Sequence, residues 1–167
     1  PGKRLRPALV LLAHETAGGR APAAAPVAAA LEMVHAFTLI HDDLPSMDDD
    51  DMRRGQPSSH VVFGEGTAIL AGDALLTEAF AVLSRIRRRG RPETAARLVT
   101  ELAEASGSGG VVGGQVLDLR SEGTHPGRGV VDFIHRRKTA RLFMAALRVS
   151  QKNRAQLDEP LQEGSPV

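Results

Sequence analysis

The feature that most constrains the fold is the apolar segment that runs from about Ala23 to His41. Its apolar side chains lie around much of the circumference of a helix rather than on one stripe: Leu31, Val34, Ala36, Phe37, Leu39 and Ile40. A helix that is apolar on most sides needs protein neighbours on most sides. The segment therefore predicts a helix in the interior of a helical bundle. Pro45 should end or kink this helix, since a proline within a helix removes a hydrogen bond and clashes with the preceding turn.

The rest of the sequence also favours helices. Apolar residues recur at the i, i+3, i+4 spacing of an amphipathic helix in residues 5–16, and further helices are expected at residues 66–86, 93–106, 111–119 and 130–149. Strand-like alternation is absent from the sequence, so the predicted fold class is all-α. Residues 150–167 are polar, contain two prolines and lack a sustained apolar period, and we expect this tail to be disordered.

Composition limits the chemistry and the partners of the chain. Its 167 residues are enough for one domain with a substantial core. It contains no cysteine, so any metal must be bound by oxygen or imidazole ligands. A net charge of +1 and an aromatic content of 3% argue against binding to nucleic acid. No apolar run approaches the roughly 20 residues of a membrane span. No secretory signal is present, so we expect a cytoplasmic protein, although the start at Pro1 leaves room for a missing N-terminal segment.

Six aspartates stand within ten positions directly after the apolar segment: Asp42, Asp43, Asp48, Asp49, Asp50 and Asp51. Such a run is most often a solvated loop, but this one is attached to a core helix and is followed by two arginines. Asp42 and Asp43 would stand at the negative end of the helix dipole, where a divalent cation would compensate their charge. Asp42 and Asp48 can converge only if the chain turns at Pro45. Carboxylates suit Mg²⁺ and arginines suit phosphates, so the run predicts a magnesium-diphosphate site.

Residues 41–55, HDDLPSMDDDDMRRG, resemble the first aspartate-rich motif of the polyprenyl synthases, the trans-isoprenyl diphosphate synthase family. The two extra residues between its aspartates resemble the bacterial short-chain type. Four further segments resemble motifs of the same family in the same order: GKRLRP at 2–7, AGDALL at 71–76, GQVLDL at 114–119 and KT at 138–139. The resemblance implies an all-α, partial isoprenoid-synthase bundle of helices with a central cavity.

The resemblance also assigns roles to residues of these motifs. Asp42 and Asp48 would ligate magnesium ions that bridge to an allylic diphosphate. That diphosphate would contact Arg53, Lys138 and the main chain at Thr139. A cationic set would hold the second substrate, isopentenyl diphosphate: Lys3, Arg6, His35 and Arg54. Two further polar residues would line or brace the site: Gln115 and Asp118.

Several of these residues also have a purely structural interpretation. Lys3 and Arg6 fit surface charges at the start of a helix, and His35 fits a hydrogen-bonded core histidine. Lys138 fits a solvated basic face of a helix. The glycines of residues 107–114 lack the GK[ST] ending of a phosphate-binding loop, so they fit close helix packing better than nucleotide binding.

The activity implied by the resemblance is that of a magnesium-dependent, homodimeric prenyltransferase that condenses isopentenyl diphosphate with an allylic diphosphate. Cations would neutralise the departing diphosphate, and no side-chain nucleophile is needed. In this family, bulk on the long helix before the first motif sets the product length. Phe37 stands five residues before Asp42, and an aromatic residue there resembles farnesyl diphosphate synthases. We therefore expect the fifteen-carbon product, with the twenty-carbon geranylgeranyl product as the alternative.

The chain departs from the family pattern in its last part. The family has a second aspartate-rich motif well beyond the lysine-threonine pair, but only 29 residues follow Lys138 and they contain no Asp-Asp pair. We expect residues 1–149 to form a partial polyprenyl synthase domain that lacks the family's N-terminal helices and C-terminal part and is inactive alone. Two other hypotheses are a truncated, non-catalytic regulatory or interaction subunit, and an unrelated helical binding protein. Retention of Asp42, Asp48 and Arg53 argues against a purely structural partner.

Overall fold

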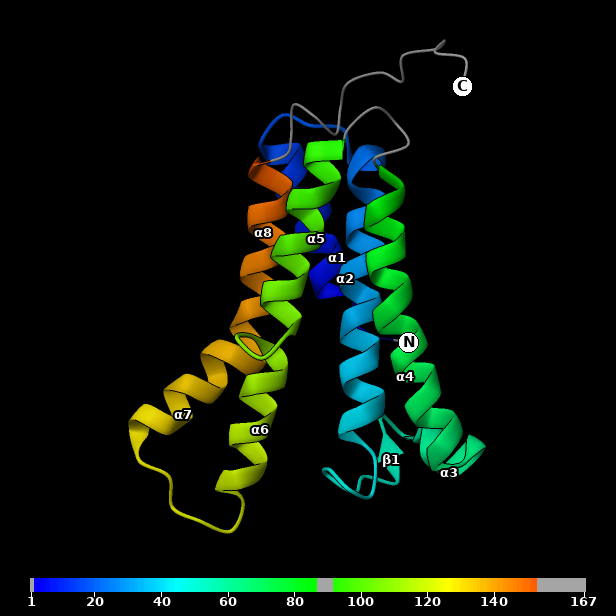
Figure 1. Ribbon diagram of the computed structural model, residues 1–167, viewed down its shortest axis with the longest axis vertical. Coiled ribbons are helices and arrows are strands. Elements are labelled where there is room, and N and C mark those ends of the chain that lie inside the picture. Colours follow the sequence, from blue (N-terminus) through cyan, green and yellow to red (C-terminus); the bar gives the residue numbers. More distant parts are fainter. Residues whose placement is uncertain (1, 87–91, 153–167) are drawn as a thin grey trace.

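The computed structural model describes residues 2–86 and 92–152, and within these ranges the protein is all-α apart from one short hairpin (Figure 1). The elements follow one another as α1 (Leu5–Thr16), α2 (Ala21–Asp42), β1 (Met52–Arg53), β2 (Gln56–Pro57), α3 (Ser59–Phe63), α4 (Glu65–Ser84), α5 (Pro92–Ser106), α6 (Val111–Ser121), α7 (Arg128–Ile134), the π-helical segment η2 (His135–Ala140) and α8 (Arg141–Lys152). The predicted fold class is therefore confirmed.

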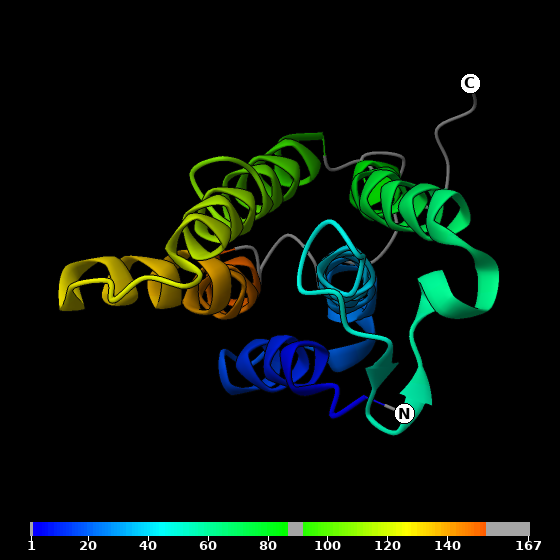
Figure 2. The same ribbon diagram turned by 90° about the horizontal axis from the view of Figure 1, so that it is seen from below.

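Helix α2 is the central element of the bundle, with α1, α4, α5 and α8 placed around it (Figure 2). It packs chiefly against α4 and α1, while α8 packs against α1 and α5. One hydrophobic core joins large side chains of five helices: Val10, Leu31, Val34, Leu83, Leu98 and Leu142. The expectation that the apolar segment forms an interior helix is confirmed, and its physical cause is the apolar circumference of α2.

The predicted helices agree with the structure to within a few residues, with one exception. The segment expected as a single helix at residues 130–149 begins at Arg128 as α7, passes through the π-helical η2 and continues as α8. A π-helical turn holds an extra residue, which a hydrophobic period does not reveal. The expected disordered tail is wrong for residues 150–152, which belong to α8, and its remainder, 153–167, lies outside the described residues.

Three short elements between the acidic run and α4 were not predicted: β1, β2 and α3. β1 pairs with β2 in antiparallel fashion, with Arg53 opposite Gln56. The connecting residues Arg54 and Gly55 have φ values of 54° and 77°, as a tight two-residue hairpin turn requires. Strands of two residues are too short to show alternation, and α3 has only five residues. The hairpin matters for the site because it orients two neighbouring arginines.

Two helices, α2 and α4, are long and apolar enough to cross a membrane by length and composition alone. The expectation that no apolar run approaches that length is wrong on this criterion. Core helices of bundles pass the same test, and α2 is such a helix. Helix α4 is less covered, since only 22% of its apolar window is buried. The cytoplasmic location stays a prediction.

Candidate active site

The acidic run folds back on itself directly after α2. The amide of Asp48 donates to the carbonyl of Asp42 at 2.9 Å, and the amides of Met47 and Asp49 donate to the carbonyl of Leu44 at 2.8 and 3.1 Å. These bonds close a compact turn around Pro45, which confirms the expected reversal of the chain. The side chain of Asp42 is 15% exposed, whereas Asp48 is exposed. The two carboxylates thus belong to one turn, one half-buried and one open to ligands.

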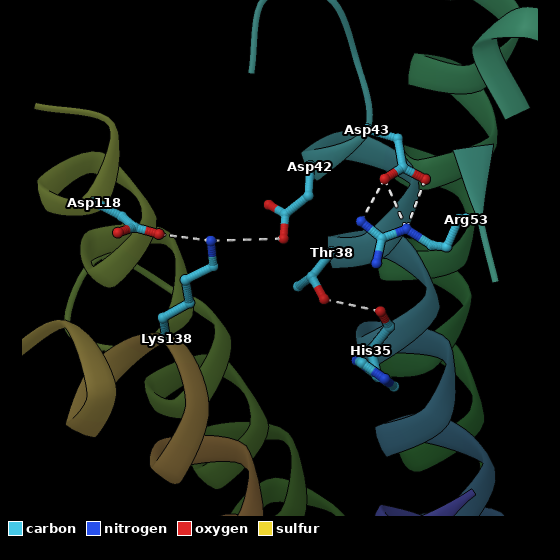
Figure 3. A network of polar contacts seen from close by, with 7 residues as sticks. All are labelled: His35, Thr38, Asp42, Asp43, Arg53, Asp118 and Lys138. Carbon is cyan, nitrogen blue, oxygen red and sulfur yellow. Dashed lines mark hydrogen bonds and ion pairs between the residues drawn. The ribbon is translucent and has the colours of Figure 1, made fainter. Parts of the chain in front are cut away.

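Asp42 faces a lysine from the opposite side of the site (Figure 3). The Nζ atom of Lys138 lies 3.8 Å from Oδ2 of Asp42 and donates a hydrogen bond of 2.7 Å to Oδ2 of Asp118. The pKa of Asp42 is raised to about 6, chiefly by burial and also by the charges of Asp48 and Asp43, against the opposing effect of Lys138. Burial alone would lower the pKa of Lys138, but the bond from Asp118 and the charge of Asp42 raise it on balance. The lysine therefore stays charged between two carboxylates.

The π-helical segment η2 brings Lys138 close to α6 through a glycine. A Cβ atom on Gly114 would lie 2.5 Å from the backbone nitrogen of Lys138, so only glycine permits this approach. The expectation that the glycine-rich segment serves close helix packing is confirmed at Gly114. Thr139 follows Lys138 in η2 with an exposed side chain. Sequence period does not predict η2, and its π-helical geometry is a common feature of functional sites.

Asp43 and Arg53 form a second, separate ion pair beside Asp42 (Figure 3). The Nε atom of Arg53 donates to both carboxylate oxygens of Asp43, at 2.7 and 2.8 Å, and its Nη2 contacts Oδ1. Asp43 is only 3% exposed, and its hydrogen bonds raise the pKa of Arg53. The sequence analysis missed this role of Asp43. The available signal was its position next to Asp42 at the end of a core helix, where a buried carboxylate needs a cation.

A cluster of cations lies further up α2, around His35. The pKa of His35 is lowered to about 4, chiefly by burial and also by the charges of Arg6, Arg54 and Arg53. Arg54 is held near the chain start, where a Cβ atom on Gly2 would lie 2.7 Å from its Nη1. The cluster joins three distant parts of the sequence and has an excess of positive charge.

Arg6 is half-buried in this cluster rather than on the surface. Burial lowers its pKa, against the effect of the Glu32 carboxylate. Its guanidinium carbon lies 4.6 Å from the ring centroid of Phe143. Its Nε atom is buried and has no hydrogen-bond partner among the described residues. The interpretation of Arg6 as a helix-start surface charge is therefore wrong, whereas Lys3 is exposed and is not brought into the cluster by any described contact.

An apolar cavity of about 250 Å³ opens beneath the acidic turn, between α2 and α6. Its walls are mostly apolar and include one aspartate: Phe37, Thr38, His41, Asp42, Met47, Val111, Val112, Gln115, Val116 and Leu119. Gln115 is 8% exposed, and both polar atoms of its amide lack a partner among the described residues. Such an amide is costly to leave unpaired, so it is a natural contact for a polar group of a ligand.

Magnesium fits the donors of the turn. Asp42 and Asp48 supply only oxygen ligands, and the pKa of Asp42 is raised chiefly by burial and to a smaller extent by the charge of Asp48, so a cation bound at the turn would compensate a poorly solvated carboxylate. Within residues 2–86 and 92–152, no three His, Asp or Glu side chains converge as a complete metal site. The turn therefore provides carboxylates for one side of a metal ion, and the other ligands must come from substrate, water or further carboxylates.

Comparison with known proteins agrees with this geometry. The polyprenyl synthetase family profile matches residues 1–162. A farnesyl diphosphate synthase of Bacillus subtilis is 50% identical over 143 residues, covering 85% of this chain and 48% of the relative. A chloroplastic geranylgeranyl pyrophosphate synthase of Arabidopsis thaliana is 51% identical over 148 residues, covering 87% of this chain and 42% of the relative.

The fold comparison gives the same family. The crystal structure of an FPP/GFPP synthase from Zymomonas mobilis superposes with a TM-score of 0.85 at 37% identity, covering 95% of this chain and 60% of that structure. The chain belongs to the polyprenyl synthetase family and has the fold of its members. It spans about half the length of the curated relatives that it matches.

Proposed function

We propose that this chain is the part of a prenyltransferase that binds and activates an allylic diphosphate for condensation with isopentenyl diphosphate. The observation that carries the proposal is the placement of Lys138 3.8 Å from Asp42, which itself lines an apolar cavity. An apolar tail can enter such a cavity while its diphosphate stays among charged groups. A regulatory subunit without substrate has no use for this combination, and the family relationship supports the catalytic reading.

The allylic diphosphate would bind at the acidic turn. Asp42 and Asp48 would hold Mg²⁺, which when bound neutralises the charge that develops on a departing diphosphate. Lys138 would donate from its ammonium to the diphosphate, because Asp118 already orients its Nζ toward the turn. Thr139 would offer its main chain beside it. Arg53 would add positive charge while its Nε remains bonded to Asp43.

Isopentenyl diphosphate would bind at the cationic cluster. Arg6 and Arg54 place positive charge there in excess of the nearby Glu32, His35 would offer its neutral imidazole as a hydrogen-bond donor, and Lys3 would close over the ligand from the chain start. The cluster and the turn both surround the second half of α2, so the two diphosphates would share one helix as a common wall. Gln115 would line the tail side of the site.

The product would be the fifteen-carbon farnesyl diphosphate, with geranylgeranyl diphosphate as the second candidate. The supporting observation is Phe37, which is 8% exposed and lines the cavity one turn above Asp42. Replacing Phe37 with Ala should enlarge the cavity and shift the product toward twenty carbons or more, measured by mass spectrometry. An unchanged product distribution in an active variant would remove Phe37 as the determinant.

The functional unit would be a homodimer. Helices α3 and α4 expose a group of large apolar side chains, 41–68% accessible each: Val61, Val62, Phe63, Ile69 and Leu70. Several large apolar side chains exposed on neighbouring helices are typical of protein interfaces. Sedimentation of the wild type and of Leu70→Glu tests the assignment, since the charged variant should be monomeric. Equal sedimenting masses for the wild type and Leu70→Glu would contradict the assignment.

The proposed function is tested by calorimetric binding of geranyl diphosphate with and without Mg²⁺. We expect magnesium-dependent binding that Asp42→Asn abolishes, and no turnover by the isolated chain. Binding that depends on neither magnesium nor Asp42 would overturn the proposal.

A second measurement follows the incorporation of labelled isopentenyl diphosphate into product after addition of a separately produced C-terminal half of a farnesyl diphosphate synthase. Product in that mixture, absent with Asp42→Asn, would show that the chain contributes a working part of the site.

A further inference from the structure

His41 stands immediately before Asp42 but points to another helix. Its Nε2 donates to the carbonyl of Ile69 on α4 at 3.0 Å, and its ring meets that of Phe37 edge-on at a centroid distance of 4.8 Å. The same ring lines the apolar cavity between α2 and α6. The His41 ring therefore lies between α4 and the cavity.

The ring can occupy this position only because residue 72 is glycine. A Cβ atom at Gly72 would overlap Nε2 and Cδ2 of His41 and would lie 3.1 Å from Cε1. These approaches are closer than the about 3.5–4.0 Å at which carbon atoms attract. Gly72 is buried within α4, where a glycine costs helix stability relative to alanine. The absence of a side chain at Gly72 leaves the space on α4 that the imidazole of His41 occupies.

We propose that Gly72 sets the usable depth of the cavity by holding His41 out of it. Gly72 and His41 would then be a second determinant of tail length besides Phe37. This determinant acts from α4, a helix that contributes none of the described residues lining the cavity. Any side chain at position 72 pushes the ring away from α4, and the space on its other side is the cavity. The inference rests on the proposed function, because it assumes that the cavity holds a prenyl tail.

The test compares binding of geranyl and farnesyl diphosphate, which carry the same head group and differ by one five-carbon unit of tail. In Gly72→Ala, farnesyl diphosphate should lose affinity relative to geranyl diphosphate by about tenfold or more, the scale of a missing methylene-sized space in an apolar pocket. Effects at the diphosphate end cancel in this ratio, including any disturbance of Asp42. In Gly72→Ala/His41→Ala the ratio should match that of His41→Ala alone, since no ring remains to be displaced.

The chain offers a matched control on the same helix. Gly66 lies in α4, and a Cβ atom there would have no neighbour within 4 Å, so Gly66→Ala should leave the ratio unchanged. An unchanged ratio in folded Gly72→Ala overturns the inference and leaves the proposed function intact. If Gly72→Ala does not fold, His41→Ala decides, because the inference requires that this variant favour the longer tail.

Diphosphate binding by the wild type distinguishes a failure of the proposed function from a failure of the inference about tail length. If it binds neither diphosphate in the presence of Mg²⁺, the proposed function fails and the inference about tail length falls with it. If it binds both, the ratio in the variants decides the inference alone. The melting temperature supplies a ligand-free check of the contact: Gly72→Ala should lower it relative to Gly66→Ala, and removal of the His41 ring should reverse most of that loss.

Discussion

Two charged regions flank the second half of α2, and they are built in opposite ways. In the acidic turn the buried and half-buried carboxylates have cationic partners: Asp43 is bonded to Arg53, and Lys138 lies between Asp42 and Asp118. Around His35 positive charges are gathered without equal compensation, and together with burial, the larger cause, they lower the pKa of that histidine to about 4. The first region is organised before ligands arrive. The second is under electrostatic repulsion that an anion would relieve, which is the expected behaviour of a diphosphate site.

The largest effect should come from the link that bridges the acidic turn. Lys138→Gln removes the cation facing Asp42 and should weaken geranyl diphosphate binding in the presence of Mg²⁺ by about 10- to 100-fold, the scale of one hydrogen bond to a charged group. Asp118→Asn should lose less, because the lysine keeps its charge and loses only its orientation. Titration calorimetry measures both.

Arg136→Gln is the matched control for Lys138→Gln, because Arg136 lies in the same segment η2 but is exposed. It removes one positive charge and should leave binding unchanged. Equal losses for Lys138→Gln and Arg136→Gln would mean that the net charge of the segment, rather than the contact with Asp42, attracts the ligand.

A smaller effect is expected on the free energy of unfolding, in which substitutions of the two hairpin arginines should differ. Arg53→Ala leaves the buried carboxylate of Asp43 without its cation and should lower the free energy of unfolding by about 2–3 kcal/mol, somewhat below the range for fully buried pairs because Arg53 is partly exposed. Arg54→Ala should be neutral or slightly stabilising, since it removes a charge from the crowded cluster around His35. Urea unfolding of both variants measures the difference. A loss in Arg54→Ala as large as that in Arg53→Ala would contradict the pairing pattern.

The two regions also differ in how far sequence could predict them. The reversal at Pro45 was predictable, because a proline after a core helix and carboxylates on both sides leave few alternatives. The half-buried position of Arg6 was not, since a basic residue at a helix start is usually solvated. The pair of Asp43 and Arg53 depends on a hairpin whose strands are two residues long, and such strands leave no periodic signal.

The same limit applies to the bundle as a whole. Helix α2 could be recognised as the core because its apolar circumference is a local property of its own sequence. The π-helical turn that carries Lys138 packs closely against α6 at Gly114, a contact that no single segment encodes. Local patterns therefore predict the elements, while the contacts that make the site depend on their mutual approach.

The smallest of these effects is the acid sensitivity of the cationic cluster. The folded-state pKa of His35, about 4, lies below its ordinary value of 6.5. The unfolded chain therefore binds more protons between these two values, and stability falls as the pH is lowered from about 6.5 toward 4. Since His35 is only half-buried, the loss should be about 1 kcal/mol after solvent screening.

Asp42 titrates in the same pH window with the opposite effect on stability, because its pKa is raised, so the wild-type curve alone does not isolate His35. The difference between the wild type and His35→Gln, measured by urea unfolding at pH 4.5 and 7.5, removes this contribution, and His125→Gln in an exposed loop is the control. If His35→Gln and the wild type lose the same stability on acidification, the cluster is not strained, and its contrast with the paired charges of the acidic turn disappears.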